Sequence, residues 1–216
     1  MDRRSILAAG GVLGLTSLAG CTNSVRAFAP GHGGAKLDSE PPTVPETHKC
    51  DRSAEELFPN ASEEELEDFQ RLGERIQEAE RDRDVALGRR RGWSLEIGEQ
   101  EVNYGDTVSF TLWRTGIEVS TGVRSMWHIE RLTEQGWEDV RVPFSRRARP
   151  LKEVNHSGGT IWEWEITLTE EGIIDAYGDD GRDEVVCPDL ETGRYRFVYC
   201  GLGADWCIGV EFDLFR

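Results

Sequence analysis

The sequence predicts a mainly β protein, an antiparallel β-sandwich of about seven strands, preceded by a disordered tether and one amphipathic α-helix. From about residue 90 onward, apolar and polar residues alternate in several short runs. Such alternation is typical of strands with one buried and one exposed face. Turn-forming residues separate the runs, and about seven short strands of this kind indicate a sandwich.

Within each predicted strand, odd- and even-numbered positions face opposite sides, and this parity assigns residues to the core or to the surface. In the run around residue 110, Val108, Phe110 and Leu112 share one face, while Trp113 has the opposite parity. The other runs cover residues 93–97, 127–130, 137–142, 162–168, 194–199 and 208–214. Their alternation places Trp127, Trp162 and Trp164 in the core.

Residues 21–50 lack apolar periodicity and are rich in Gly, Pro, Ser and Thr, which predicts a disordered tether. Segment 51–88 contains a helix signal. Ser62 and Glu65 have the spacing of a capping box, and Leu66, Phe69, Leu72, Ile76 and Ala79 form one apolar stripe. We expect a helix from about 62 to 82. Its stripe either packs on the sandwich domain at 89–216, which we favour, or pairs with a second copy.

The first residues have the pattern of an export signal, which we place at 1–20. Arg3 and Arg4 precede a 14-residue apolar run, 6–19, which is shorter than the roughly 20 residues needed to span a bilayer. Leu18-Ala19-Gly20-Cys21 resembles a lipobox, and the paired arginines resemble a twin-arginine (Tat) signal. The resemblance implies cleavage before Cys21, a lipid on Cys21, and a location on the extracellular face of the cell membrane.

The amino-acid composition excludes some classes of binding partner. The formal net charge is −16, which argues against nucleic acid and disfavours electrostatic docking on anionic lipid. The only lysines are Lys36, Lys49 and Lys152. Abundant acids, few lysines and a Tat-type signal together resemble secreted proteins of halophilic archaea. In that setting the acidity mainly keeps the protein soluble.

With Cys21 modified, Cys50, Cys187, Cys200 and Cys207 remain. Four cysteines in an exported chain suggest two disulfides, with three possible connectivities. Cys200 and Cys207 flank a short loop with matching parity, which favours a bridge between them and leaves Cys50 to pair with Cys187. A metal site using His48 and His156 is the alternative, although no Cys-x2-Cys spacing supports it.

The segment Leu190-Glu191-Thr192-Gly193-Arg194-Tyr195 has the spacing of a tyrosine corner. Together with Tyr104-Gly105-Asp106 and the hairpin at 127–137, it resembles bacterial and archaeal immunoglobulin-like domains of secreted lipoproteins. The resemblance implies that the Tyr195 hydroxyl bonds back to the chain upstream. It implies little about activity, because such domains have many functions. The usual cysteine of the second strand is missing.

No catalytic motif is recognisable. His32, His48, His128 and His156 lie in no nucleophile motif, so we expect a non-catalytic protein without a cofactor. The acidic loop 179–184 could bind Ca²⁺ but lacks the EF-hand spacing, so a solvated loop is the simpler interpretation.

The expected function is binding or a structural role in the cell envelope. The chain would contact the membrane through Cys21, and its partner would be an envelope or extracellular protein or a glycan. Trp206, placed at a loop tip, and Trp113 are candidate ligand contacts, which makes a carbohydrate-binding module the alternative. An extracellular enzyme with an unrecognised site is a further alternative. Asn155, in a predicted loop, and Asn60 match the N-glycosylation pattern.

Overall fold

The computed structural model describes residues 35–67, 84–116, 118–143, 152–178, 184–203 and 206–216. Arg3, Arg4, Cys21 and most of the predicted helix lie outside these ranges. The helices are α1 (Ala54–Leu57) and α3 (Glu170–Asp175), with a further helical stretch at residues 63–67. The strands are β1 (Asp84–Leu87), β2 (Arg89–Arg90), β3 (Trp93–Ile97), β4 (Glu101–Asn103), β5 (Thr107–Arg114), β6 (Val119–Thr121), β7 (Trp127–Thr133), β8 (Gly136–Asp139), β9 (Arg141–Pro143), β10 (Val154–His156), β11 (Gly159–Thr167), β12 (Glu184–Val186), β13 (Gly193–Tyr199) and β14 (Trp206–Phe215).

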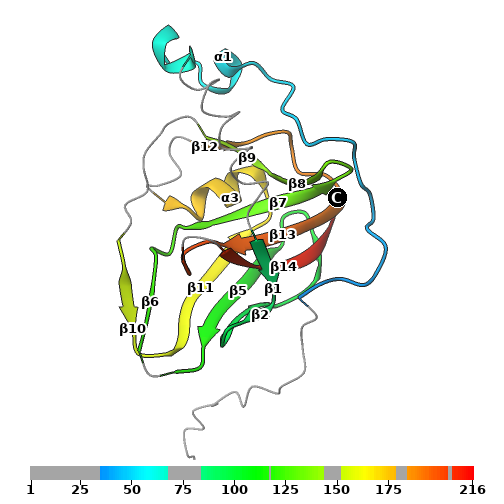
Figure 1. The fold of residues 1–216 in the computed structure, drawn as a ribbon. Helices are drawn as coiled ribbons and strands as arrows, with labels where there is room; N and C mark the ends of the chain where they lie inside the picture. Colours follow the sequence, from blue (N-terminus) through cyan, green and yellow to red (C-terminus); the bar gives the residue numbers. More distant parts are fainter. Residues whose placement is uncertain (1–34, 68–83, 117, 144–151, 179–183, 204–205) are drawn as a thin grey trace, which may run out of the picture. The chain divides into compact units, whose positions relative to one another are not determined.

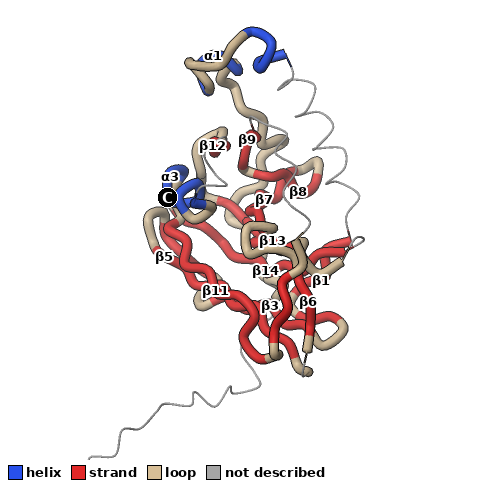
Figure 2. The backbone as a smooth tube through the Cα atoms, turned by 90° about the vertical axis from the view of Figure 1, so that its left-hand side faces the viewer, coloured by secondary structure: helices blue, strands red, loops and turns tan. Residues whose placement is uncertain are grey.

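Two sheets form a sandwich-like arrangement, which confirms the predicted mainly β class. The larger has the order β1-β14-β13-β7-β8, with β4 also paired to β14, and the second has the order β11-β5-β3-β2. Two small sheets, β10-β6 and β12-β9, are separate from these. Figures 1 and 2 show the strands of the two main sheets from two perpendicular directions.

Most strand pairs are antiparallel, as predicted, including β13 with β14 and with β7, and β5 with β3 and β11. The exceptions are β1 and β4, which both pair parallel to β14. Alternation reports which face of a strand is buried and carries no information on strand direction, so these two parallel edges were not predicted.

Aromatic side chains fill the space between the sheets. The rings of Phe110 and Phe197 stack with centroids 4.3 Å apart, so they join β5 of one sheet to β13 of the other. Trp164 tilts against Phe197 at 5.1 Å, and all three rings are buried. Burying a large side chain contributes about 1.5–3 kcal/mol relative to leaving it exposed, so this cluster is a main source of stability.

All three helical segments among the described residues begin at a capped residue, α1 at Ser53. The Ser62 backbone N–H donates to Oε2 of Glu65 at 2.8 Å, and the Glu65 N–H donates to Oγ of Ser62, which confirms the predicted capping box. Helical residues 63–67 follow, and the rest of the predicted helix, with most of its apolar stripe, lies outside the described residues. Helix α3 was not predicted. Its N-cap is Thr169, and Ile173 is its buried anchor.

Residues 35–50, placed in the tether by the sequence, are instead bound to the larger sheet. Arg194 on β13 donates to the carbonyls of Leu37 and Ser39 at 3.2 and 2.9 Å. The Leu37 N–H donates to Oε2 of Glu211 on β14 at 2.9 Å. Figure 1 shows this segment running along the outside of the sandwich. The prediction of a free tether up to residue 50 was therefore wrong over its second half.

Candidate functional site

Two disulfides join the predicted cysteine partners. Cys50 pairs with Cys187, and Cys200 pairs with Cys207, with Cα–Cα distances of 5.0 and 4.3 Å. The first bond connects the N-terminal segment to the loop before β13, and the second closes the β13–β14 connection. Both pairings confirm the sequence-based prediction and remove the cysteines from the alternative metal site.

The loop between β12 and β13 contains the predicted tyrosine corner. The Tyr195 hydroxyl donates to the carbonyl oxygen of Glu191 at 2.8 Å and accepts from the Glu191 N–H at 3.2 Å. The Tyr195 ring is buried against Phe212. One side chain therefore fixes the start of β13 to the loop that precedes it.

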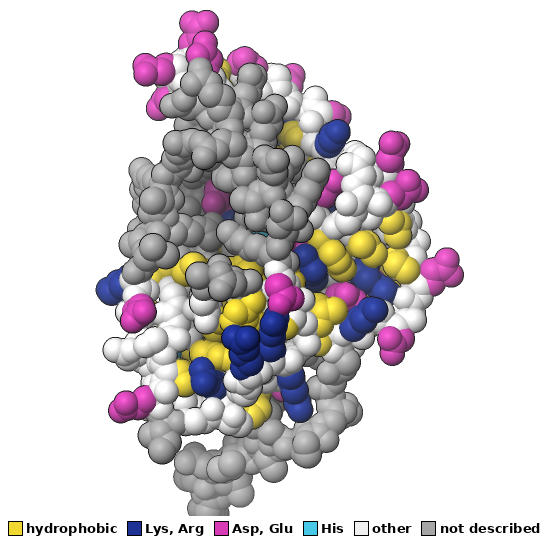
Figure 3. All heavy atoms as spheres, in the orientation of Figure 1, with side chains coloured by type: hydrophobic (Ala, Val, Ile, Leu, Met, Phe, Trp, Pro, Cys, Tyr) yellow, Lys and Arg dark blue, Asp and Glu magenta, His cyan; other side chains and the backbone are white. Residues whose placement is uncertain are grey.

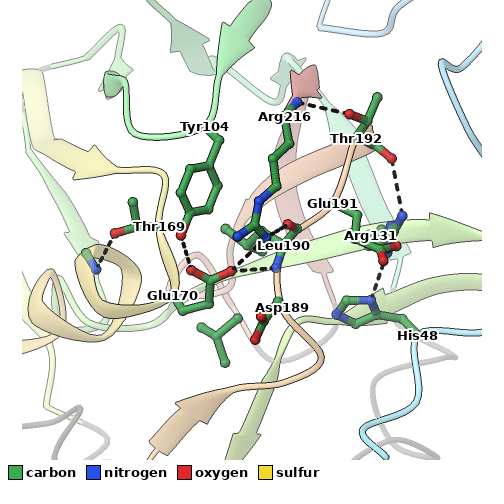
Figure 4. Close-up of polar contacts among 12 residues, drawn as sticks. His48, Tyr104, Arg131, Thr169, Glu170, Asp189, Leu190, Glu191, Thr192 and Arg216 are labelled. Atoms are coloured by element: carbon green, nitrogen blue, oxygen red, sulfur yellow. Dashed lines mark hydrogen bonds and ion pairs between the residues drawn. The ribbon is translucent and has the colours of Figure 1, made fainter.

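His48 and Arg131 lie together beside this corner, as Figure 4 shows. Both side chains are buried, and Nη1 of Arg131 is 3.5 Å from Nδ1 of His48 and 3.0 Å from a carboxylate oxygen of Glu191. Burial and the positive charge of Arg131 lower the pKa of His48 to about 4. Since the neutral ring accepts the Arg131 proton at Nδ1, His48 is held as a neutral packing group and is a poor general base at pH 7.

A second part of the same network reaches the C-terminus. The Tyr104 hydroxyl donates to Glu170, whose other carboxylate oxygen accepts the Leu190 N–H at 2.8 Å. Arg216 donates to the Leu190 carbonyl at 2.6 Å, as Figure 4 shows. These bonds indicate a structural role, because they join the segments of Tyr104, Glu170 and Arg216 to the loop before β13.

The outer face of the larger sheet carries a buried charged cluster that the sequence did not reveal. Nε2 of His128 lies 2.8 Å from Oε1 of Glu130, and the other oxygen of Glu130 accepts from Arg196. Asp139 lies opposite Glu130 in register and pairs with Arg141 at 2.7 Å. His128 and Glu130, like Asp139 and Arg141, are two residues apart in the sequence, but only the strand register brings the two pairs and Arg196 together, so the whole cluster could not be predicted.

Both acids of this cluster are held ionised. Burial opposes ionisation of Glu130, but His128 and Arg196 outweigh it and lower its pKa. Burial likewise opposes ionisation of Asp139, and Arg141 outweighs it, so the pKa of Asp139 is lowered. A carboxylate neutralised by arginine is a weak base. The cluster is therefore better suited to holding strands together than to accepting a proton from a substrate.

His156 is a histidine that touches a hydroxyl. Its Nε2 lies 2.9 Å from Oγ1 of Thr121, and that hydroxyl also donates to the Gly122 carbonyl at 2.8 Å. Because a hydroxyl has one proton, the Gly122 bond leaves Thr121 as the acceptor from His156. This arrangement is the reverse of an activated nucleophile.

The prediction that Trp206 lies at a loop tip was wrong. Trp206 begins β14 and is only 9% exposed, with the guanidinium carbons of Arg90 and Arg91 at 5.2 and 5.8 Å from its ring centre. Trp113 is half-buried on β5, in the other sheet, and its indole N–H donates to Glu96 at 3.4 Å. The two tryptophans therefore come from different sheets and form no shared stacking platform.

The remaining predicted positions are exposed or undescribed. Asn155 is exposed but lies on β10, where its side chain accepts from Ser120 at 2.6 Å, so its assignment to a loop was wrong. Asn60 is exposed after α1. The acidic loop is outside the described residues except for Glu184, which binds Arg141 at 2.7 Å. Among the described residues, no group of three His, Cys, Asp or Glu side chains could hold a metal ion.

No protein-family model matches this chain, and no curated protein is found that matches it. Within the part of the chain that the structure describes, no helix combines the length and apolar character needed to cross a membrane.

Proposed function

We propose that this chain is an exported, lipid-anchored surface lipoprotein whose immunoglobulin-like sandwich is a non-catalytic binding or structural module of the cell envelope. The observation that carries the proposal is the pair of disulfides, Cys50–Cys187 and Cys200–Cys207. Disulfides form and persist in oxidising compartments outside the cytoplasm. Of the five cysteines, they leave Cys21, which follows Leu18-Ala19-Gly20.

The strand pairing supports an immunoglobulin-like domain. One main sheet contains β14, β13, β7 and β8, the other contains β11, β5 and β3, and Tyr195 forms its corner at the start of β13. The paired Arg3 and Arg4 support export by the Tat route, and the acidic, lysine-poor composition supports a halophilic archaeal host.

The carbohydrate-binding alternative has lost its main support, because burial of Trp206 removes the exposed ring on which it depended. The enzyme alternative would place its chemistry at His128 and Glu130. The ion pairs that hold this cluster fit a structural role better. An envelope or extracellular protein remains the favoured partner class.

The test is membrane retention of the native protein in its host. Cys21→Ser should move the sandwich from the membrane fraction to the medium, with Cys50–Cys187 intact by non-reducing peptide mapping. Unchanged retention would contradict the lipid anchor. Replacing Arg3 and Arg4 with Lys should stop export, whereas normal export would contradict the Tat route.

A further inference from the structure

Three arginines form one cationic surface at the β2–β3 end of the sandwich. Trp93 pairs in register with Arg90 on one side and with Arg114 on the other, and Arg91 follows Arg90 at the turn. We call Arg90, Arg91 and Arg114 the arginine cap. Figure 3 shows Lys and Arg side chains gathered on this face, in a protein whose net charge is −16.

Two buried indoles hold the arginine cap in place. Arg90 and Arg91 lie over the Trp206 ring, and the guanidinium carbon of Arg114 is 4.8 Å from the centre of the Trp93 ring. Cation–π contact uses the flat face of a guanidinium, so its N–H edges stay available for a ligand. This geometry is suited to phosphate oxygens, which arginine binds through two parallel N–H bonds.

Two members of the arginine cap have no ion-pair partner within the described part of the chain. Arg90 pairs with Asp84, but the side chains of Arg91 and Arg114 form no hydrogen bond or ion pair with any other described residue. Nε of Arg114 is buried without a partner.

Arg91 occupies a position that its side chain does not favour. Its φ is 53° and that of Gly92 is 81°, and together they form the two-residue turn between β2 and β3. Such turns favour Asn or Gly at the first position, because residues with a Cβ are strained at positive φ. An exposed arginine kept in this strained place points to a role outside folding.

The chain enters the sandwich next to this surface. A Cβ added to Gly88 would clash with Cβ of Ala35, so Ala35, the first described residue, lies against the residue that joins β1 to β2. Thirteen residues, 22–34, separate Ala35 from Cys21. Fully extended, they span at most about 45 Å. A lipid on Cys21 would therefore keep the arginine cap within that distance of the bilayer.

We propose that the arginine cap docks on the phosphate headgroups of the anionic membrane to which Cys21 anchors the chain. This inference rests on the proposed lipid anchor. The net charge of −16 disfavours long-range attraction to anionic lipid, but in the molar salt of a halophilic host the Debye length is about 3 Å, so the groups in direct contact with the headgroups decide the docking.

The test measures vesicle binding without the lipid anchor. The full 216-residue chain with Cys21→Ser is mixed with vesicles of phosphatidylcholine, with or without about 30% phosphatidylglycerol, and binding is measured by co-sedimentation in about 0.1 M salt. The decisive variant is Arg91→Gly, which removes a charge and suits the positive φ, so it should fold well. The matched control is Lys49→Gln, an exposed charge next to Cys50, whose disulfide holds this segment at Cys187 rather than at the β2–β3 turn.

Arg91→Gly should weaken binding to anionic vesicles about fivefold, and Arg91→Gly with Arg114→Gln about thirtyfold, since each arginine near an anionic surface contributes about one factor of five. Lys49→Gln should leave binding unchanged. Equal binding by the parent and both arginine variants, or an equal loss in the control, would overturn the proposal. Retention on a sulfated glycan column without preference for anionic vesicles would also overturn it. Since Cys21 is absent throughout, none of these results depends on lipidation.

Discussion

Arg91 lies over the Trp206 ring while its own backbone is left-handed, with φ at 53°. The contact explains why a tryptophan that begins the last strand is buried: arginines from a neighbouring hairpin cover it. The left-handed backbone adds a cost that glycine would not have. This pair therefore combines a stabilising contact with a local strain.

Arg91→Gly should raise the free energy of unfolding by up to about 1 kcal/mol, because relief of strain at positive φ outweighs loss of an exposed cation–π contact. Urea denaturation would measure the change. Arg91→Ala serves as the control, since it removes the same guanidinium but keeps a Cβ, and should be less stable than Arg91→Gly. Equal stability of the two variants would show that the positive φ at Arg91 is not strained.

His48 should make the protein less stable as the pH falls from about 6.5 toward 4. Its pKa is about 4 in the folded protein and 6.5 in an unfolded chain, so the unfolded chain binds the proton first and acid favours unfolding. Between about pH 7.5 and 4.5, protonation of this residue alone should lower the free energy of unfolding by about 2–3 kcal/mol. Urea denaturation of His48→Gln should show a correspondingly smaller loss over the same interval. Parallel pH profiles for the two proteins would show that His48 is not the titrating group.

The Tyr195 corner should be worth about 1–2 kcal/mol, because its buried hydroxyl makes two bonds to Glu191. Tyr195→Phe keeps the ring packing and removes both bonds, and thermal unfolding would report the loss. Tyr104→Phe is the matched control. Its hydroxyl bonds to Glu170 at a half-buried site, so the loss there should be smaller. A larger loss at Tyr104 would contradict the importance of the corner.

The two disulfides should differ in stabilisation because they close loops of different length. Cys50 and Cys187 are 137 residues apart, whereas Cys200 and Cys207 are 7 apart. From the loss of loop-closure entropy in the unfolded chain, the long-loop disulfide should add about 5 kcal/mol to the free energy of unfolding and the short-loop disulfide about 2 kcal/mol. Replacing each pair with serines and comparing urea midpoints tests the order. A greater loss from the short loop would contradict it.

Parity predicted the core well where each strand has one face in water. Phe110 and Trp164 were placed correctly, because the residues that alternate with them on β5 and β11 are exposed or only partly buried. Trp162 shares the core parity yet is only half-buried. Its indole N–H bonds to the Tyr199 hydroxyl next to the bulge in β11, and pattern alone does not locate a bulge.

The outer face of the larger sheet could not be predicted in the same way. Glu211 and Asp213 alternate with core residues, which indicates exposure, yet both are buried. Residues 35–39 lie over them, and Arg194 neutralises Asp213 at 2.9 Å. An irregular segment has no periodicity to reveal where it packs. The charged cluster at Glu130 and Asp139 was missed because it depends on register between strands.

The most direct test of the lipid anchor is mass spectrometry of the first peptide of the mature protein, purified from host membranes. We predict that this peptide begins at Cys21 and carries a lipid on that residue. A mature protein that keeps residues 1–20, or one that begins at an unmodified Cys21, would contradict the proposed lipoprotein.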